Sequence, residues 1–345
     1  MINLCIDYAK IPLKLIELSK HKRILLVRFS SLGDILLTTP FIRAIKKQLP
    51  DIVLDMLVRE EYADAIKLNP YINTRLSFSK NEKNNFDLIE RLKNNKYDLI
   101  IDLQNNLRSR KLTSALKIRK ILFDKRSIDK FLLVNFKINK LKEAPPIPVR
   151  YAYTINDLQL DKDGLDLFTD KTANPIILEK KNLIGFCPGA QHFTKRWPEK
   201  YFIELGNTLI NDGFSLALFG GKIDKEICSR LSNVIPGIIN LSNDNDLLQT
   251  AADMKLCKAV VCNDSGLMHV ASAMKTNIIA IFGSSVKEFG FSPYNWNNLI
   301  LENNSLNCRP CSHIGRSSCP KKHFDCMNLT TSKMVLDNLK SILKL

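Results

Sequence analysis

Short apolar runs alternate with segments of helical periodicity along most of the chain. In the first half the runs lie at residues 23–29, 52–58 and 97–103, and helical patterns cover 60–68 and 84–95. Strands that alternate with helices form βαβ units, which build a parallel sheet with helices on both faces. The pattern therefore predicts an α/β fold.

The alternation fades between residues 124 and 182 and then restarts more regularly. Five further strands are predicted, at 182–188, 214–220, 237–242, 259–265 and 277–283. Helices are predicted after the first four of these strands, at 197–212, 224–233, 245–256 and 266–275. Two series of βα units in one chain predict two doubly wound domains.

The chain has 345 residues, which is enough for two domains of about 150 residues each. We expect a first Rossmann-like domain over 23–170, a second over 183–330, and a C-terminal helix over 331–345. Residues 1–22 are predicted to form an amphipathic extension that either packs on the first domain or rests on a membrane surface. The apolar residues on one side of this predicted helix are Leu4, Ile11, Leu15 and Leu18.

Charge narrows the class of partner. The net charge is +16, from 51 Lys and Arg residues against 35 Asp and Glu residues, which favours a polyanion such as nucleic acid, anionic lipid or a phosphorylated glycan. The chain lacks the aromatic and basic pattern of RNA-binding sheets and the ligand spacing of DNA-binding zinc fingers, so no nucleic-acid partner is expected. We find no run of 18 apolar residues and no secretory signal, and therefore expect a cytoplasmic protein.

In doubly wound sheets ligands bind beyond the carboxyl ends of the strands, so the loops that follow strands are the candidate sites. Four of these loops combine glycine with polar or charged residues. They are SSLGD (30–34), PGAQHFTKRWP (188–198), FGGKIDKE (219–226) and CNDSGLMHVASA (262–273). Backbone N–H groups near Gly189 and at the predicted helix start at Gly266 suit a phosphate group, and Lys195 adds positive charge.

The candidate residues in these loops each have a simpler alternative role. Asp34 is either a catalytic carboxylate or a helix cap. Lys195 is either a phosphate ligand or a cation in a solvated loop. Glu226 either binds a ribose or lies on a solvated helix face, and His269 is either near a ligand or a packed helical residue.

Together the loops and their flanking segments resemble glycosyltransferase family 9, the ADP-heptose:lipopolysaccharide heptosyltransferase family. Four segments carry the resemblance, in this order over about residues 23–330: ILLVRFSSLGDILLTTPFIRAIKKQLP, YDLIIDLQNNLRS, GFCPGAQHFTKRWPEKYFIELGNTL and VVCNDSGLMHVASAMKTNIIAIFGSS. The resemblance implies the GT-B architecture, in which two Rossmann-like domains face each other across a cleft. The first domain would hold the acceptor and the second the nucleotide sugar.

The resemblance also implies a reaction. A heptose would pass from ADP-heptose to the lipid A-linked inner core of lipopolysaccharide, with inversion at the anomeric carbon and without a catalytic metal ion. Asp34 would be the general base. The residues implied for the donor are Gly189, Lys195, Glu226, Asp264, Ser265, Gly266 and His269, and we expect the acceptor at Ser31, Gln104, Arg108 and Arg110.

The basic stretch 108–126 belongs to the predicted acceptor domain. It suits the anionic lipid A-core acceptor or the anionic leaflet that presents it, and otherwise it is a solvated helix face. We therefore expect a peripheral protein at the inner face of the inner membrane.

Four of the nine cysteines cluster near the C-terminus with the spacing C-x2-C followed by C-x6-C. They are Cys308, Cys311, Cys319 and Cys326. Four thiolates at such spacing suit a structural zinc ion, and free packed thiols or disulfides are the alternatives.

The sequence is also compatible with other functions. The enzyme alternatives are a family 9 transferase that uses another nucleotide sugar and a nucleotide-sugar epimerase of the same architecture. The non-enzyme alternative is a basic protein that binds nucleic acid or an anionic membrane.

Overall fold

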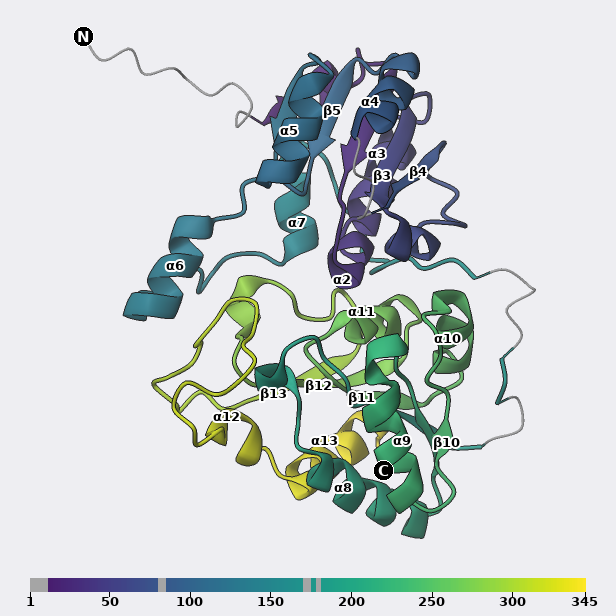
Figure 1. The fold of residues 1–345 in the computed structure, drawn as a ribbon, viewed down its shortest axis with the longest axis vertical. Helices are drawn as coiled ribbons and strands as arrows, with labels where there is room; N and C mark the ends of the chain where they lie inside the picture. Colours follow the sequence, from purple (N-terminus) through teal and green to yellow (C-terminus); the bar gives the residue numbers. More distant parts are fainter. Residues whose placement is uncertain (1–11, 80–84, 170–174, 178–180) are drawn as a thin grey trace. The chain divides into compact units, whose positions relative to one another are not determined.

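The computed structural model describes residues 12–79, 85–169, 175–177 and 181–345. The chain divides into two compact units, one made of residues 1–127 with 147–168 and the other of residues 128–146 with 169–345. Each unit has a parallel sheet and a hydrophobic core of its own (Figure 1). The prediction of an α/β fold with two Rossmann-like units is confirmed.

Five parallel strands form the main sheet of the first unit, in the order β4-β3-β2-β5-β6. Their bounds are β2 (Arg23–Val27), β3 (Val53–Arg59), β4 (Arg75–Phe78), β5 (Leu99–Asp102) and β6 (Lys120–Leu122). The central strand β2 pairs with β3 on one side and β5 on the other, and the side chains of Ile24 to Val27 are fully buried. A strand with helices on both faces needs such an unbroken apolar run.

The helices of this unit are α2 (Leu32–Leu36), α3 (Thr39–Gln48), α4 (Asn85–Asn94), α5 (Leu107–Ala115) and α7 (Ile147–Ala152). The helix predicted over 60–68 is instead a short 3-10 helix, Glu60–Ala65. Buried Arg43 on α3 pairs with Asp161 and Asp166, and this tie holds the segment after α7 against the unit.

The helix predicted within residues 1–22 is reduced to one turn among the described residues, and Leu4 and Ile11 lie outside them. A two-residue strand β1 (Leu13–Lys14) pairs in parallel with β7 (Ile155–Asn156), and a single helical turn α1 (Leu15–Leu18) follows. Leu13 and Leu18 are buried. Pairing with a distant strand satisfies the backbone of β1, and this tertiary contact outweighs the local helical periodicity.

Six parallel strands form the sheet of the second unit, in the order β10-β9-β8-β11-β12-β13. Their bounds are β8 (Leu183–Cys187), β9 (Ser215–Leu218), β10 (Ile239–Asn240), β11 (Ala259–Asn263), β12 (Asn277–Phe282) and β13 (Asn298–Glu302). The five predicted strands are all present, and β13 extends the sheet beyond them. Central β8 pairs with β9 and β11, and all five of its residues are buried.

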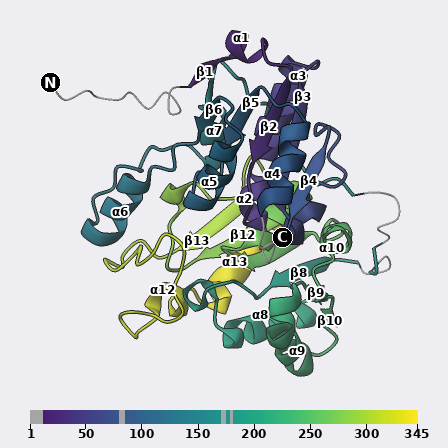
Figure 2. The ribbon, with the colours of Figure 1, turned by 45° about the horizontal axis from the view of Figure 1, so that its top comes forward.

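The helices of the second unit are α6 (Ser127–Phe136), α8 (Glu199–Asn211), α9 (Lys225–Val234), α10 (Leu247–Met254), α11 (Gly266–Ala273), α12 (Asp325–Asn328) and α13 (Ser332–Leu343). Helices α8 and α9 lie side by side next to β9 and β10 (Figure 2). The predicted C-terminal helix is confirmed as α13, whose Val335 and Leu339 enter the core of this unit.

The units differ from the expected domains in one segment. Residues 128–146, which hold nearly all of α6, group with the second unit although the first unit resumes at residue 147. Leu133 and Leu141 pack with Val286 and Phe289, and Lys137 Nζ donates to the carbonyl of Pro310 at 2.7 Å. These contacts join residues more than a hundred positions apart, so local periodicity carries no sign of them.

Among the described residues, no helix has both the length and the apolar character that crossing a bilayer requires.

In each sheet the strand order reverses direction between two neighbouring central strands. These are β2 and β5 in the first unit and β8 and β11 in the second. At this point the loops that follow the two strands run in opposite directions and leave a crevice between them. Doubly wound folds bind ligands in this crevice.

Candidate functional site

Lys195 and Asp264 form an ion pair beyond the carboxyl ends of β8 and β11. Lys195 Nζ lies 2.6 Å from Asp264 Oδ2, and Ser285 Oγ donates to the same oxygen at 2.5 Å. Burial by itself would raise the pKa of Asp264, but the Lys195 charge and the Ser285 hydrogen bond outweigh burial and lower it. The carboxylate therefore stays ionised and holds the ammonium group beside the start of α11.

Asn263, the last residue of β11, closes the loop that carries Lys195. Its side chain accepts from the Trp197 backbone N–H at 3.0 Å and donates to the Pro188 carbonyl at 2.8 Å. Trp197 is buried and its indole N–H donates to the Thr330 carbonyl at 2.7 Å, whereas Arg196 donates to the Ala190 carbonyl. Trp197 is thus a core anchor, and of the two neighbouring cations Lys195 is the one beside Asp264.

Gly189 packs directly against Asp224, a residue that the sequence analysis did not single out. A Cβ at position 189 would lie 2.0 Å from Asp224 Oδ1, so any larger residue requires the loop or the carboxylate to move. Burial raises the pKa of Asp224, although the Gly221 N–H and the Arg196 charge oppose the shift. The predicted carboxylate, Glu226, lies two residues further on, with an 88% exposed side chain paired to Arg230 at 2.5 Å.

The start of α11 offers unused hydrogen-bonding groups. Ser265 is the N-cap residue, and its buried Oγ has no hydrogen-bond partner among the described residues. Gly266 is the first helical residue, and the N–H groups of the first turn have no partner within the helix. His269 is buried one turn further on, and its charge contributes to the low pKa of Asp264. A helix start of this kind binds anions.

In the first unit the half-buried Asp34 forms an ion pair with buried Arg28, which was not among the predicted site residues. Arg28 Nη2 lies 2.5 Å from Asp34 Oδ1, and the Ser31 hydroxyl and backbone N–H donate to Asp34 Oδ2 at 2.8 and 2.9 Å. Burial would raise the pKa of Asp34, but Arg28 and the Ser31 hydrogen bonds outweigh burial and lower it. Asp34 therefore does support the helix start, although Ser31 and not Asp34 is the N-cap.

Gln104 holds the loop after β2 in place from the neighbouring strand end. Its Oε1 accepts from the backbone N–H groups of Phe29 and Ser30 at 2.9 and 3.2 Å. Arg28 Nη1 donates to the Leu103 carbonyl at 2.7 Å. The structure thus gives Gln104 a positioning role, and it brings Ser31, Asp34 and Gln104 to one edge of the sheet.

Cations surround this edge of the first sheet. Arg110 Nε donates to Asn105 Oδ1 at 2.7 Å, and the Arg108 guanidinium lies over the Phe78 ring at 5.0 Å. Lys125 is half-buried, and burial followed by the charges of Arg28 and Arg110 lowers its pKa. Lys125 belongs to the basic stretch 108–126 but was not among the predicted site residues.

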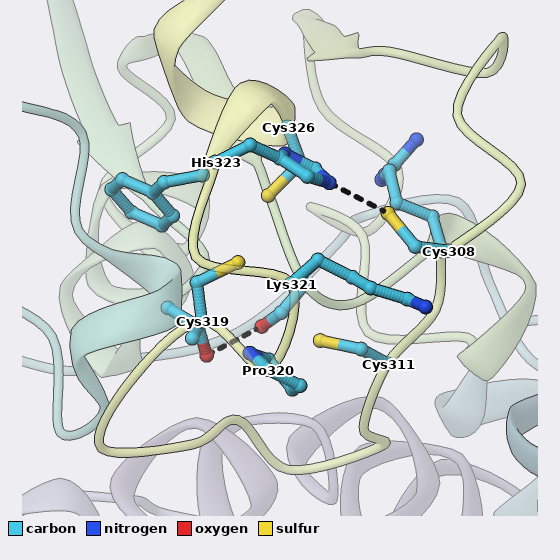
Figure 3. Close-up of a pocket in the computed structure, with 11 residues that line it drawn as sticks. Cys308, Cys311, Cys319, Pro320, Lys321, His323 and Cys326 are labelled. Carbon is cyan, nitrogen blue, oxygen red and sulfur yellow. Dashed lines mark hydrogen bonds between the residues drawn. The ribbon is translucent and has the colours of Figure 1, made fainter.

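The four C-terminal cysteines line one small cavity together with His323 (Figure 3). All four are free thiols. In the part of the chain that the structure describes, no three His, Cys, Asp or Glu side chains lie in a ready coordination geometry.

The chain is similar in sequence to members of one known family. The model of glycosyltransferase family 9 (heptosyltransferase) matches residues 85–322. Lipooligosaccharide heptosyltransferase 2 of Campylobacter jejuni is 28% identical over 328 residues, which cover 91% of this chain and 96% of that protein. The protein of the same name from Haemophilus influenzae is 27% identical over 296 residues, covering 77% and 84%.

Solved structures share the fold. A glycosyltransferase family 9 protein from Veillonella parvula superposes with a TM-score of 0.75 at 19% identity, over 97% of this chain and 99% of that one. ADP-heptose lipopolysaccharide heptosyltransferase II of Escherichia coli superposes with a TM-score of 0.72 at 22% identity, over 93% and 98%. Because the family model spans more than half of the chain, this protein belongs to glycosyltransferase family 9 and is a glycosyltransferase with the GT-B fold.

Proposed function

We propose that this glycosyltransferase moves a heptose from ADP-heptose to the inner core of a lipid A-linked lipopolysaccharide acceptor. The observation that carries the proposal is the Lys195–Asp264 ion pair beside the start of α11. The names of the relatives from Campylobacter and Haemophilus, both lipooligosaccharide heptosyltransferases, support this donor and acceptor.

The second unit supplies what a leaving nucleoside diphosphate needs. The Lys195 ammonium would offset the charge that develops on the diphosphate, and the Ser265 hydroxyl with the first N–H groups of α11 would bind its oxygens. Asp264 keeps Lys195 in position. Gly189, which has no side chain, would let the backbone of the loop after β8 come close to the diphosphate. Because these groups carry the charge, we propose that the transfer itself requires no metal ion.

The first unit supplies a base for the attacking hydroxyl. We propose that Asp34 removes the proton as the hydroxyl attacks the anomeric carbon from the face opposite the leaving group, which inverts the configuration. Its lowered pKa keeps it ionised at neutral pH. Arg28 fixes the orientation of the carboxylate, and Ser31 donates two hydrogen bonds to its other oxygen.

An anionic acceptor suits the cations around this carboxylate. Arg108, Arg110 and Lys125 lie at the same edge of the sheet, and the low pKa of Lys125 reflects burial among other positive charges. An acceptor that carries phosphate or carboxylate groups would relieve this repulsion.

A lipid A-linked acceptor is embedded in a membrane. We therefore propose that this protein works at the cytoplasmic face of the inner membrane. The basic stretch 108–126 supports this part of the proposal. So do the exposed apolar side chains of α6, Ile128, Phe131 and Phe136, whose two phenylalanine rings lie 5.9 Å apart. Exposed apolar side chains on a helix suit a lipid surface, and basic residues suit an anionic one.

Incubation of the purified protein with ADP-heptose and a lipid A-core acceptor tests the proposal directly. Release of ADP that requires both substrates, with a heptose added to the acceptor, is expected. Release of ADP with a different acceptor only, or transfer from a different nucleotide sugar only, would change the substrate part of the proposal.

A further inference from the structure

Three of the four C-terminal cysteines lie in a segment without regular secondary structure, and Cys326 lies just after it in α12. Between the end of β13 at Glu302 and the start of α12 at Asp325, the chain forms neither helix nor strand. Most of its side chains are exposed or half-buried. A connection of this length inside a compact unit needs ties other than backbone ladders.

The sulfur atoms of the four cysteines point toward one common space (Figure 3). The cavity measures about 20 Å³, which is room for a single atom-sized occupant. His323 lies at its rim, with Nε2 3.9 Å from Cys308 Sγ. Four thiols around a cavity of this size match the ligand set of a closed tetrahedral metal site, which the side chains complete by rotating inward.

We propose that Cys308, Cys311, Cys319 and Cys326 bind one thiophilic divalent ion, zinc or iron(II), and that this ion fixes the segment against the loop of Lys195. Each thiol gives up its proton to solvent as it becomes a ligand. The ion would stand apart from the reacting groups, so its role is positional.

One set of hydrogen bonds joins the cysteine segment to Thr194, the neighbour of Lys195. The Thr194 N–H donates to the Arg316 carbonyl at 3.1 Å, and the Arg316 N–H donates back to Thr194 Oγ1 at 2.8 Å. Arg316 lies in the chain between Cys311 and Cys319. Thr194 Oγ1 also donates to Ser284 Oγ at 2.9 Å.

A second set joins the segment to the loop of Ser285. Buried Arg309, which lies between Cys308 and Cys311, donates to the carbonyls of Gly283 at 2.6 Å and Ser285 at 2.8 Å. The Cys311 N–H donates to the Ser284 carbonyl at 3.2 Å. Lys195 and Ser285 hold Asp264, and the cysteine segment contacts their chain neighbours Thr194 and Ser284. Loss of the ion is therefore expected to loosen the group formed by Lys195, Asp264 and Ser285.

Metal content is measured first, on the full chain purified under reducing conditions without a polyhistidine tag. Mass spectrometry of the metals is expected to find about one zinc or iron ion per chain, and the identity of the ion separates the two cases. Cys308→Ser/Cys311→Ser is expected to lose the ion. Cys257→Ala, which removes a buried thiol of the same unit outside the cluster, is expected to keep it.

Donor-site coupling is measured as ADP affinity by calorimetry, and this arm rests on the proposed function. Removing the ion from the unaltered protein with a chelator should weaken ADP binding on the order of tenfold, and adding the ion back should restore it. The double serine variant should bind ADP as weakly as the metal-free protein and should not respond to added ion.

The possible failures are distinguishable. A reduced protein that binds neither zinc, iron(II) nor cobalt(II) overturns the metal site and leaves four packed thiols. Binding of an ion with unchanged ADP affinity after its removal overturns the coupling. A protein that binds the ion but no ADP keeps the metal site and contradicts the proposed donor.

Discussion

The ionisation of Asp34 depends on its partner Arg28, whose charge helps to keep the half-buried carboxylate ionised. Asp34→Asn removes the negative charge but keeps the size of the side chain. We expect turnover to fall by a factor on the order of 10² or more, with ADP affinity close to that of the unaltered protein. The melting temperature should fall, because Arg28 loses the carboxylate that pairs with it. Near-normal turnover in steady-state assays of ADP release would reduce Asp34 to a helix-capping role.

The pH dependence follows from the same ion pair. Since the folded-state pKa of Asp34 is lowered, the stabilisation from its ionised form is complete above the unfolded pKa of about 3.9 and is lost only as the pH falls through the folded value. Asp34 should therefore produce no acid limb in kcat/KM between about pH 5 and 8. In Arg28→Gln burial is less opposed, so the pKa rises and an acid limb should move toward neutral pH. A profile that Arg28→Gln leaves unchanged would contradict this role of Arg28.

Lys195 is expected to affect donor affinity as well as rate. Lys195→Ala removes one charge-assisted contact to the diphosphate and should weaken ADP binding by about 1.5–3 kcal/mol, measured by calorimetry. Lys200→Ala is the matched control, because it removes the same charge from an exposed residue of α8 whose Nζ lies over the Tyr201 ring. Equal ADP affinity in both variants would return Lys195 to the alternative of a cation in a loop.

At the scale of elements, the loop after β8 requires a glycine at position 189, because a side chain there would collide with Asp224. Gly189→Ala places a methyl group where Asp224 Oδ1 now lies, so we expect a lower melting temperature and weaker ADP binding. Gly189→Ala combined with Asp224→Ala removes the obstructing carboxylate and should recover part of both losses. Additive effects in this double-mutant cycle would show that the glycine and the carboxylate act independently.

At the scale of the whole molecule, the net charge of +16 predicts salt-sensitive binding to anionic surfaces. Binding to anionic lipid vesicles should weaken as salt rises, and neutral vesicles should bind little. Reversing Arg110, Lys111, Lys117 and Lys120 to Glu should lower vesicle binding, at about 1 kcal/mol for each basic residue near the surface. ADP affinity should not change, because the proposed donor groups belong to the other unit. Vesicle binding that ignores both salt and these substitutions would contradict the membrane part of the proposal.

Local pattern was enough to predict most of the fold. The apolar runs of β2, β3, β5, β8, β9, β11 and β12 and the helices after β8, β9 and β11 were predicted near their observed places, because central strands of a parallel sheet need unbroken apolar runs. Of the four edge strands of the two main sheets only β10 was predicted, and β4, β6 and β13 gain their hydrogen-bonding partners only from the assembled sheet. Of the predicted N-terminal helix, the described residues hold only the single turn Leu15–Leu18, because the residues before it pair with β7 as β1.

Local sequence pattern specifies the alternation of strands and helices, the family, and the loops that carry Asp34, Lys195 and Asp264. Only the tertiary structure joined these loops to their partners: Arg28 to Asp34, Ser285 to Asp264, and Asp224 to Gly189. Likewise only the fold brought residues 128–146 to the second unit and the cysteine segment beside Thr194. Spacing along the chain specifies what a local segment can form, whereas an ion pair or a shared cavity depends on which strand ends become neighbours when the sheets assemble.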